Sequence, residues 1–390
     1  MIRIAFVHNS FPAGGAERVT VDIASYLNSY GGYEVFVYAS RISEALLTDG
    51  LLKNFTLRNI PTQLISSRRA KQIERYILED KIDILVQPGK AIHGIEKIKE
   101  RTGVKTIVAC HGEPFWQRHA IMYRRQKGVF RKLMWHIFNK QRFEDGTLAM
   151  RMAISRTRRD YETSDAYTVL CRSYIQETLS VLGIDEVSSH IYAIENSERP
   201  VAEVNYKKEN IILFIGRFEN WSKRIDRLLR IWHSVQNRMP EWKLVLVGDG
   251  ADWLRIRKLA DDMHLQRIHF EGRQNNVAEY YQKASVVVLT SETEGWGLAL
   301  TEGQAMGCIG VAFGCTSGIK EVLSSNCGCG FVVPPFDEGK YADILLAIAA
   351  MDDNEKMTIR RRAVERTLKY APEIISEKWR VLFEYLKQNE

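Results

Sequence analysis

The stretch that decides the fold runs from residue 286 to residue 302 and reads Val-Val-Val-Leu-Thr-Ser-Glu-Thr-Glu-Gly-Trp-Gly-Leu-Ala-Leu-Thr-Glu. An apolar run is followed by a glycine-bearing turn and then by the start of a helix. In this setting backbone N–H groups point at an anion. Glu294 lies in the predicted turn and Glu302 about two helical turns further on, so the two carboxylates can bind different hydroxyls of one elongated ligand. On spacing alone, a turn residue and a solvated helix residue explain them equally well.

Short apolar runs alternate with amphipathic stretches on both sides of this segment, a pattern typical of parallel α/β architecture. In the second half the runs predict strands at 211–215, 242–247, 267–271, 285–289 and 309–313. In the first half they predict strands at 4–7, 34–38, 84–87, 106–110 and 166–170. Helical spacing of apolar residues predicts helices over 17–27, 224–235 and 277–283, and over 363–386 with an interruption at Pro372.

A length of 390 residues predicts two domains. The polar stretch 195–210, which contains Pro200 and shows no clear period, is the predicted linker. We therefore expect a first Rossmann-like domain over 1–197, a second over 198–370, and a final helix over 371–390 that packs back on the first domain. Two doubly wound domains place a ligand cleft between the carboxyl ends of their sheets.

Composition narrows the class of protein. The 55 Lys and Arg residues against 48 Asp and Glu give a net charge of +7. No recognised nucleic-acid module accompanies the basic residues, so we expect no nucleic-acid partner. The N-terminal apolar run is too short for a signal peptide, and no stretch approaches the ~20 apolar residues of a spanning helix, so a cytoplasmic protein is expected.

The six cysteines are expected to be small buried thiols, because they fall in apolar or glycine-rich stretches without regular spacing. The pair Cys327-Gly-Cys329 lacks the second pair that a zinc site needs. The six are Cys110, Cys171, Cys308, Cys315, Cys327 and Cys329.

The stretch 115–143 combines aromatic and basic residues, with no Asp or Glu between Arg118 and Arg142. Such a composition suits the surface of an anionic membrane and predicts peripheral attachment at its inner face. A core helix with a solvated basic face is the alternative, with about equal weight. The basic residues are Arg118, Arg124, Arg125, Lys127, Arg131, Lys132, Lys140 and Arg142.

Three further motifs follow predicted strands. Arg217 and Lys223 lie on the loop after 211–215, and two cations there suit a diphosphate, although ordinary surface charges explain the two residues better when they are taken alone. The adjacent Gly14 and Gly15 precede a helix and permit close approach of a phosphate, or form a turn that needs no ligand. His111 ends the strand 106–110 and opens into the predicted cleft, where it binds a ligand or serves a structural role.

Residues 291–302 resemble the Glu-x7-Glu signature of family 4 retaining glycosyltransferases, which adopt the GT-B fold: two Rossmann-like domains that face each other across a cleft. The similarity is specific, covers nearly all of the second half and is weaker in the first. Arg224 departs from it, because the family often has glycine there. The resemblance extends to Gly307, Gly318, Glu321 and the segments 247–250, 270–272 and 330–335.

The resemblance implies a role for each motif. The first domain is implied to be the acceptor side and the second to bind the nucleotide sugar. Arg217 and Lys223 are implied to bind the donor diphosphate and stabilise the departing nucleotide, and Glu302 to hold the ribose. Glu294 and His111 are implied to contact the transferred sugar. Further donor-binding positions are Gly14, Gly15, Gly216, Gly272, Arg273, Gly297 and Leu298.

The resulting expectation is a retaining glycosyltransferase. It moves a hexose or N-acetylhexosamine from a nucleotide diphosphate sugar, with UDP favoured, to a glycan or lipid-linked glycan in bacterial surface-polysaccharide assembly. The scheme requires neither a metal ion nor another cofactor. A nucleotide-sugar hydrolase or epimerase of the same fold, and a non-catalytic nucleotide-sugar-binding partner subunit, remain alternatives. A nicotinamide-dependent oxidoreductase is disfavoured, because the first strand–helix turn lacks G-x-G-x-x-G.

Overall fold

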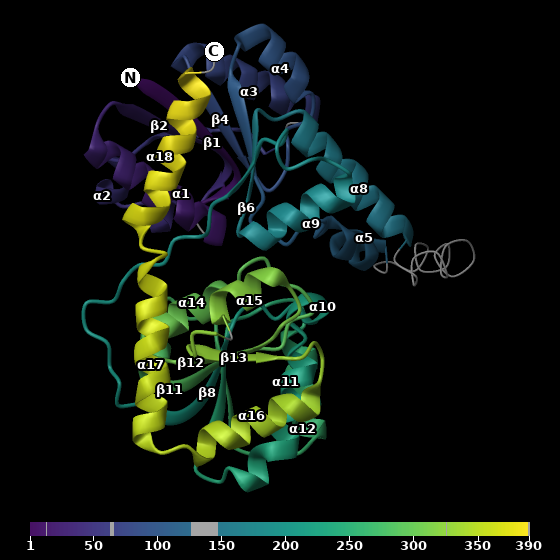
Figure 1. Cartoon of the computed structure of the whole chain (residues 1–390), viewed down its shortest axis with the longest axis vertical. Helices are drawn as coiled ribbons and strands as arrows, with labels where there is room; N and C mark the ends of the chain where they lie inside the picture. Colours follow the sequence, from purple (N-terminus) through teal and green to yellow (C-terminus); the bar gives the residue numbers. More distant parts are fainter. Residues whose placement is uncertain (13, 63–65, 126–146, 325, 389–390) are drawn as a thin grey trace. The chain divides into compact units, whose positions relative to one another are not determined.

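The computed structural model describes all residues except 13, 63–65, 126–146, 325 and 389–390 (Figure 1). The chain divides into two units. The first comprises Met1–Ser197 with Pro372–Glu390, and the second comprises Glu198–Ala371. No helix among the described residues is both long and apolar enough to cross a bilayer.

The first unit is built on a parallel sheet of seven strands in the order β3-β2-β1-β4-β5-β6-β7. The order reverses between β1 and β4, so the connecting helices cover both faces. The strands are β1 Ile2–Phe11, β2 Tyr33–Ile42, β3 Thr56–Asn59, β4 Ile84–Pro88, β5 Lys105–Ala109, β6 Ala166–Val169 and β7 Ile191–Ala193. The helices are α1 Gly15–Tyr30, η1 Glu44–Leu46, α2 Asp49–Leu52, α3 Ser66–Asp80, α4 Ile95–Thr102, α5 Gln117–Arg125, α8 Thr147–Glu162, α9 Arg172–Leu182 and α18 Pro372–Gln388.

The second unit repeats this plan with six parallel strands in the order β10-β9-β8-β11-β12-β13, which is the Rossmann order. The strands are β8 Glu209–Ile215, β9 Lys243–Val247, β10 Ile268–Gly272, β11 Ala284–Leu289, β12 Ile309–Phe313 and β13 Gly330–Val333. The helices are α10 Asn220–Lys223, α11 Ile225–Val235, η2 Gln236–Arg238, α12 Trp253–Asp262, α13 Ala278–Lys283, α14 Leu298–Ala305, α15 Ser317–Leu323, α16 Glu338–Ala350 and α17 Asp353–Leu368. The prediction of two Rossmann-like α/β domains is confirmed.

The last helix of the chain completes the core of the first unit. Figure 1 shows α18, in yellow, running along α1, in purple. Three α18 side chains, Trp379, Phe383 and Leu386, are at most 5% exposed and belong to the same apolar cluster as Leu27 of α1. Pro372 is the first residue of α18, a position where the missing N–H costs nothing.

The ten predicted strands are present, with ends that differ by a few residues from prediction. Three edge strands, β3, β7 and β13, were not predicted, because each is only three or four residues long. The predicted helix 224–235 begins one residue later as α11, because Arg224 takes a left-handed conformation (φ 46°, ψ 49°) that ends the short helix α10.

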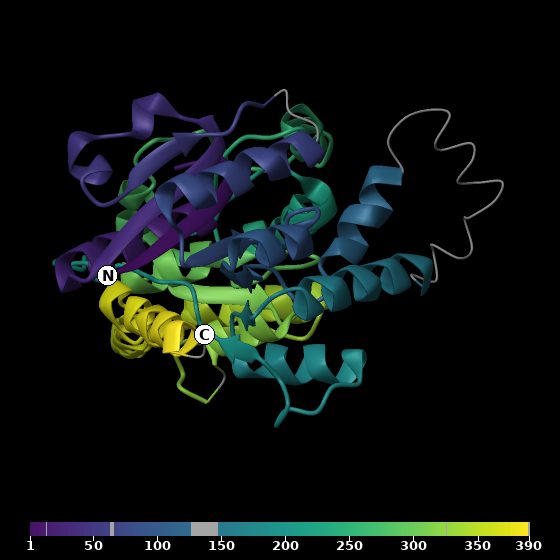
Figure 2. The ribbon, with the colours of Figure 1, turned by 90° about the horizontal axis from the view of Figure 1, so that it is seen from above.

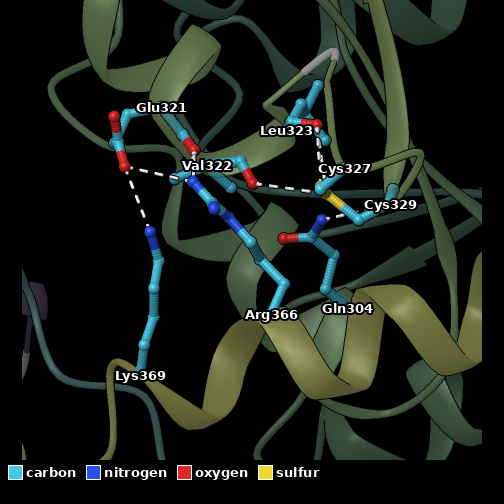
Figure 3. Close-up of a disulfide and its surroundings, with 8 residues drawn as sticks. All are labelled: Gln304, Glu321, Val322, Leu323, Cys327, Cys329, Arg366 and Lys369. Atoms are coloured by element: carbon cyan, nitrogen blue, oxygen red, sulfur yellow. Dashed lines mark hydrogen bonds and ion pairs between the residues drawn. A yellow bond between two sulfur atoms is a disulfide. The ribbon is translucent and has the colours of Figure 1, made fainter.

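The prediction of free thiols is wrong for one pair of cysteines. Cys327 and Cys329 form a disulfide, shown in Figure 3, beside Gln304, whose carboxamide donates to the carbonyl of Cys329 (3.1 Å). Gly328 between them has φ +60°, and this turn brings the two Cα atoms to 5.4 Å, within the range that a disulfide spans. Cys110, Cys171 and Cys308 are buried thiols, as predicted, whereas the Cys315 thiol is only partly buried.

Candidate functional site

Four loops meet at the carboxyl edge of the second sheet, and they carry the motifs singled out in the second half of the sequence. Strands β10, β9, β8 and β11 are neighbours in that order, and in a parallel sheet their carboxyl ends share one edge. Arg273 follows β10, the 248–250 turn follows β9, Arg217 and Lys223 follow β8, and Glu294 follows β11. The fold therefore brings the predicted diphosphate-binding and sugar-binding residues of this unit to one edge.

The closest contact between these loops joins Lys223 to Glu294. The Lys223 ammonium lies 2.6 Å from Oε1 of Glu294, and the Ser291 hydroxyl donates to the same oxygen at 2.6 Å. The side chains of Lys223 and Glu294 are only 19% and 10% exposed. A charge-assisted contact of this length in a sheltered place fixes both side chains. Ser291 belongs to the segment 291–302, but the sequence did not predict this role for it.

A second set of ion pairs, next to this contact, joins the segment after β8 to the loop after β11. Arg224 donates to Glu292 (2.8 Å) and Asp226 (3.1 Å), and Arg227 donates to Glu292 (2.7 Å). The Glu292 N–H also donates to the carbonyl of Ser222 (2.7 Å). Burial acts to raise the pKa of Asp226, but the hydrogen bonds and charge of Arg224, together with Asn220 and Arg230, outweigh it and lower that pKa to about 2. Arginine here takes the left-handed conformation that glycine adopts more easily, and its ion pairs offset the strain.

Glycines bring the loops after β8, β9 and β10 together. The Gly248 N–H donates to the carbonyl of Gly272 (2.8 Å), and the Gly216 N–H donates to that of Val247 (3.1 Å). A Cβ atom at Gly248, whose φ is +133°, would collide with the carbonyl oxygen of Gly216. Gly216 and Gly272, both predicted to border the donor, are thus part of the backbone that positions Arg217.

Two arginines at this edge are open to solvent. The Arg217 side chain is 74% exposed and makes one loose contact, 3.3 Å to Glu219. Arg273 is exposed, and none of the described residues pairs with it. Guanidinium groups held loosely at a strand edge are available to an incoming anion.

Glu302 is positioned by a buried tyrosine, so it is not a solvated helix residue. Helix α14 begins at Leu298 after Gly297, which has φ +79° and packs so closely on Ile319 that a Cβ would come within 2.7 Å of its side chain. Glu302, in the second turn, accepts a hydrogen bond from Tyr281 (2.9 Å). Burial, and then Glu302 itself, raise the pKa of the Tyr281 hydroxyl well above 10, so it remains a donor.

In the first unit, His111 lies at the carboxyl end of β5 and lines a cavity of about 260 Å³ together with Glu17 and Trp116. Its Nδ1 is 3.0 Å from the carboxamide oxygen of Asn196. Burial lowers the pKa of His111 below its usual 6.5, so the ring is neutral at pH 7. When Nδ1 donates to Asn196, Nε2 is left as an acceptor, able to receive a ligand hydroxyl.

The Gly14–Gly15 turn holds a carboxylate of its own. Gly15 begins α1, and a Cβ at Gly14 (φ +142°) would collide with the carboxylate of Glu17. Glu17 also lies 3.7 Å from Nδ1 of the buried His8. Sequence reasoning missed Glu17, although an acidic residue in the first turn of a helix is itself a signal, because the helix dipole favours it.

The aromatic and basic stretch 115–143 is only partly visible. Its residues from 126 onward lie outside the described residues. In the described part, Phe115 is buried, and Ile121 of α5 packs against Ala149 of α8, as expected for a core helix. These two helices lie side by side in Figures 1 and 2. Membrane contact remains a prediction. Within the described part of the chain, no group of three His, Cys, Asp or Glu side chains is arranged to hold a metal ion.

Comparison with known proteins agrees with this architecture. Residues 13–197 match the model of Glycosyltransferase Family 4, and residues 196–366 match that of Glycosyl transferases group 1. An uncharacterized glycosyltransferase of Haemophilus influenzae is 22% identical over 96% of this chain and 98% of its own length. A Campylobacter jejuni α-1,4-N-acetyl-D-galactosaminyltransferase, named for a diNAcBac-PP-undecaprenol glycan, is 27% identical over 47% of this chain and 50% of its own.

Solved structures share the fold. The lipopolysaccharide outer core galactosyltransferase WaaB superposes with a TM-score of 0.67 over 97% of this chain and 98% of its own, at 16% identity. Anabaena Alr3699/HepE, solved with UDP and glucose, gives 0.74 over 99% and 100%, at 15% identity. The two family matches together run from residue 13 to residue 366. The chain is therefore a glycosyltransferase and belongs to family 4 of these enzymes.

Proposed function

We propose that this protein is a retaining enzyme that transfers a hexose or N-acetylhexosamine from a nucleotide diphosphate sugar, with UDP favoured, to a hydroxyl of a glycan or lipid-linked glycan. The observation that carries the proposal is the sheltered contact between Lys223 and Glu294, which sets a cation for the diphosphate against a carboxylate for the sugar. The two groups belong to loops that leave neighbouring strands, β8 and β11, where ligands of α/β sheets bind.

The donor's charged part is assigned to the cations. Arg217 is exposed and makes one weak contact, so its planar guanidinium group can reorient and donate two hydrogen bonds to phosphate oxygens. Lys223 is held in place and acts as a point charge. Backbone N–H groups near Gly297, at the start of α14, add further donors. Together these groups stabilise the negative charge that develops on the leaving diphosphate, and such preorganised charge is usually the largest contribution to catalysis.

The donor's hydroxyl groups are assigned to the carboxylates. Glu302, oriented by Tyr281, holds the ribose hydroxyls, and Glu294 accepts from hydroxyls of the transferred sugar. In the first unit, the neutral His111 can accept from a sugar hydroxyl through Nε2. In each of these contacts a hydroxyl group of the ligand donates a hydrogen bond, and a carboxylate or a neutral imidazole of the protein accepts it.

In the proposed reaction, the bond from the anomeric carbon to the diphosphate oxygen breaks and a bond to the acceptor oxygen forms on the same face. The acceptor's proton passes to the leaving phosphate oxygen. No metal ion takes part in this scheme, because the cations supply the charge. The complex of Anabaena Alr3699/HepE with UDP supports UDP as the nucleotide, and the names of the Campylobacter relative and of WaaB support a glycan of the bacterial surface as acceptor. We propose that the enzyme works in the cytoplasm, at the inner face of the membrane.

Isothermal calorimetry with UDP, GDP and NAD, without added metal, tests the donor site. We expect UDP or GDP to bind, and Arg217→Ala to weaken that binding by about tenfold or more, because a charge-assisted hydrogen bond is lost. Lys258→Ala is the matched control, since its side chain is 75% exposed against 74% for Arg217. Binding of NAD alone, or unchanged nucleotide binding in Arg217→Ala, would overturn the assignment.

Turnover separates the transferase from its alternatives. A UDP-sugar or GDP-sugar carrying the bound base is incubated with the protein, with and without a glycan acceptor. Transfer that requires the acceptor and keeps the anomeric configuration supports the proposal. Rapid donor breakdown without an acceptor indicates a hydrolase, and binding without any turnover in either mixture indicates a partner subunit.

A further inference from the structure

A second, larger cavity lies in the first unit, at the carboxyl ends of β1 and β4, and has a volume of about 440 Å³. Among the described residues, four cationic side chains line it, and Asp160 is the one carboxylate that does so. The cations are Arg69 of α3, Lys90 after β4, and Arg156 and Arg159 of α8. The proposed donor-binding scheme uses none of them.

Most of this positive charge is not neutralised by carboxylates in the described part of the chain. Asp160 pairs with Arg159, whose Nη2 is 3.0 Å from Oδ1. Lys90 and Arg156 are exposed, and neither forms an ion pair within 4.0 Å among the described residues, although Lys90 is close enough to Asp160 to act on the pKa of that carboxyl. Arg69 donates to neutral groups, the Asn9 carboxamide oxygen at 2.8 Å and the His8 carbonyl at 3.4 Å. Three cations around one cavity repel one another unless an anion enters it.

Two buried carboxamides in the cavity wall also lack partners. Gln87 is 2% exposed; its oxygen accepts from the N–H of Ile92 (2.7 Å), but its Nε2 has no partner among the described residues. Gln117 is 7% exposed, and its Oε1 is unpaired within the same part of the chain. Buried polar side-chain atoms without a partner are uncommon, and both line the cavity. A donor and an acceptor are thus left for a polar ligand.

The cavity adjoins the one that contains His111. Both are lined by Val7, Asn9, Pro88 and Trp116, so one ligand can extend through the two. The smaller cavity offers the neutral His111 and the carboxylate of Glu17, which suit sugar hydroxyls. The larger offers cations, which suit a phosphate.

We infer that the larger cavity binds a phosphate or diphosphate group attached to the acceptor glycan, while the acceptor sugar lies on the Glu17 side of the smaller one and His111 is left to the transferred sugar. This inference rests on the proposed glycosyl transfer and names its acceptor class. Lys90, Arg69 and Arg156 contact the phosphate oxygens, and Gln87 donates to one of them. The shared chemistry has two sources: a glycan on a lipid diphosphate carrier, and a glycan on a polyol-phosphate chain.

Calorimetry on the full chain tests the site, with UDP present at saturation so that the donor cations are occupied. The probes are inorganic pyrophosphate, which stands for a lipid diphosphate, and glycerol 3-phosphate, which stands for a polyol phosphate. Methyl glucoside is the neutral control. We expect at least one phosphate probe to bind with one site per chain, and Lys90→Ala and Arg156→Ala each to weaken it tenfold or more.

Both substituted side chains are exposed, so the variants should fold, and circular dichroism checks this. Arg151→Ala is the matched control, because Arg151 is exposed on the same helix α8 but does not line the cavity. We expect it to bind the probe as the unchanged protein does. No saturable binding of either phosphate probe, or binding that Lys90→Ala and Arg156→Ala leave unchanged, would overturn the inference.

The outcomes separate this inference from the proposed function. If neither UDP nor GDP binds while pyrophosphate binding still depends on Arg156, the donor assignment fails and the anion site stands. If a nucleotide binds and the phosphate probes do not, the acceptor class is wrong and the donor assignment stands. Tighter binding of pyrophosphate than of glycerol 3-phosphate identifies the lipid diphosphate as the source, and the reverse order identifies the polyol phosphate.

Discussion

Replacement of Lys223 by methionine removes the cation beside Glu294 and keeps most of the side-chain volume. The two groups are 2.6 Å apart and 19% and 10% exposed, so solvent screens them only in part. An exposed pair contributes about 0–1 kcal/mol, whereas removal of one partner of a fully buried pair costs about 3–5 kcal/mol. Ser291 still donates to Glu294 after the change. We therefore expect the free energy of unfolding, measured by urea denaturation, to fall by about 2 kcal/mol.

A second substitution separates stability from function. In Lys223→Met/Glu294→Gln both charges are gone, so no buried carboxylate is left unpaired and most of the lost stability should return. Nucleotide affinity should not return, because the cation for the diphosphate is still missing. We expect the Kd for UDP, or for GDP if that nucleotide binds, to rise about 10- to 100-fold in both variants by calorimetry. A double variant that binds the nucleotide as tightly as the unchanged protein would refute the assignment, because Lys223 would then serve only Glu294.

Three further changes test other parts of the structure. Arg224→Gly relieves the strain of a left-handed residue but loses two ion pairs, so we expect a net loss of about 1 kcal/mol in urea denaturation; a gain in stability would show that the ion pairs contribute nothing. Gly248→Ala places a methyl group against the Gly216 carbonyl, so we expect it to lower the free energy of unfolding by more than about 2 kcal/mol and to abolish most nucleotide binding. Gly339→Ala is the control, because a methyl group there makes only ordinary van der Waals contacts and should change neither property. Burial lowers the pKa of His111, so between that pKa and 6.5 the unfolded chain binds more protons; its contribution to stability is intact above pH 6.5 and falls as the pH drops through this window. Unfolding of the protein and of His111→Asn from pH 8 to pH 5 should show this difference, and parallel curves would contradict it.

The central strands of both sheets could be predicted from the sequence because they are buried on both faces and read as continuous apolar runs. In β11, for example, all six residues are buried. The edge strand β3 has no buried residue, so its sequence carries no comparable signal. A short edge strand is held by pairing with its neighbour, and that pairing depends on the fold of the whole unit.

The motifs of the candidate site could be read locally, but the contacts between them could not. Lys223 and Glu294 are 71 residues apart, and Arg224 and Glu292 are 68 apart. Which pairs meet depends on the strand order that makes β8 and β11 neighbours. The cavity beside His111 gave no signal at all in the sequence, because its cations come from three separate segments.

The place of α18 has a consequence for how the protein is made. During translation the chain emerges from the ribosome N-terminus first, and domains tend to fold as they emerge. The second unit is one continuous segment, whereas the first receives Trp379 and Phe383 for its core only when residues 372–388 are synthesised. Translation therefore completes the second unit before the first, even though the first begins the chain. During that interval the apolar surface of α1 that α18 covers is open to water and to other chains, so a nascent protein stalled before residue 372 should be prone to aggregation and a ready substrate for chaperones.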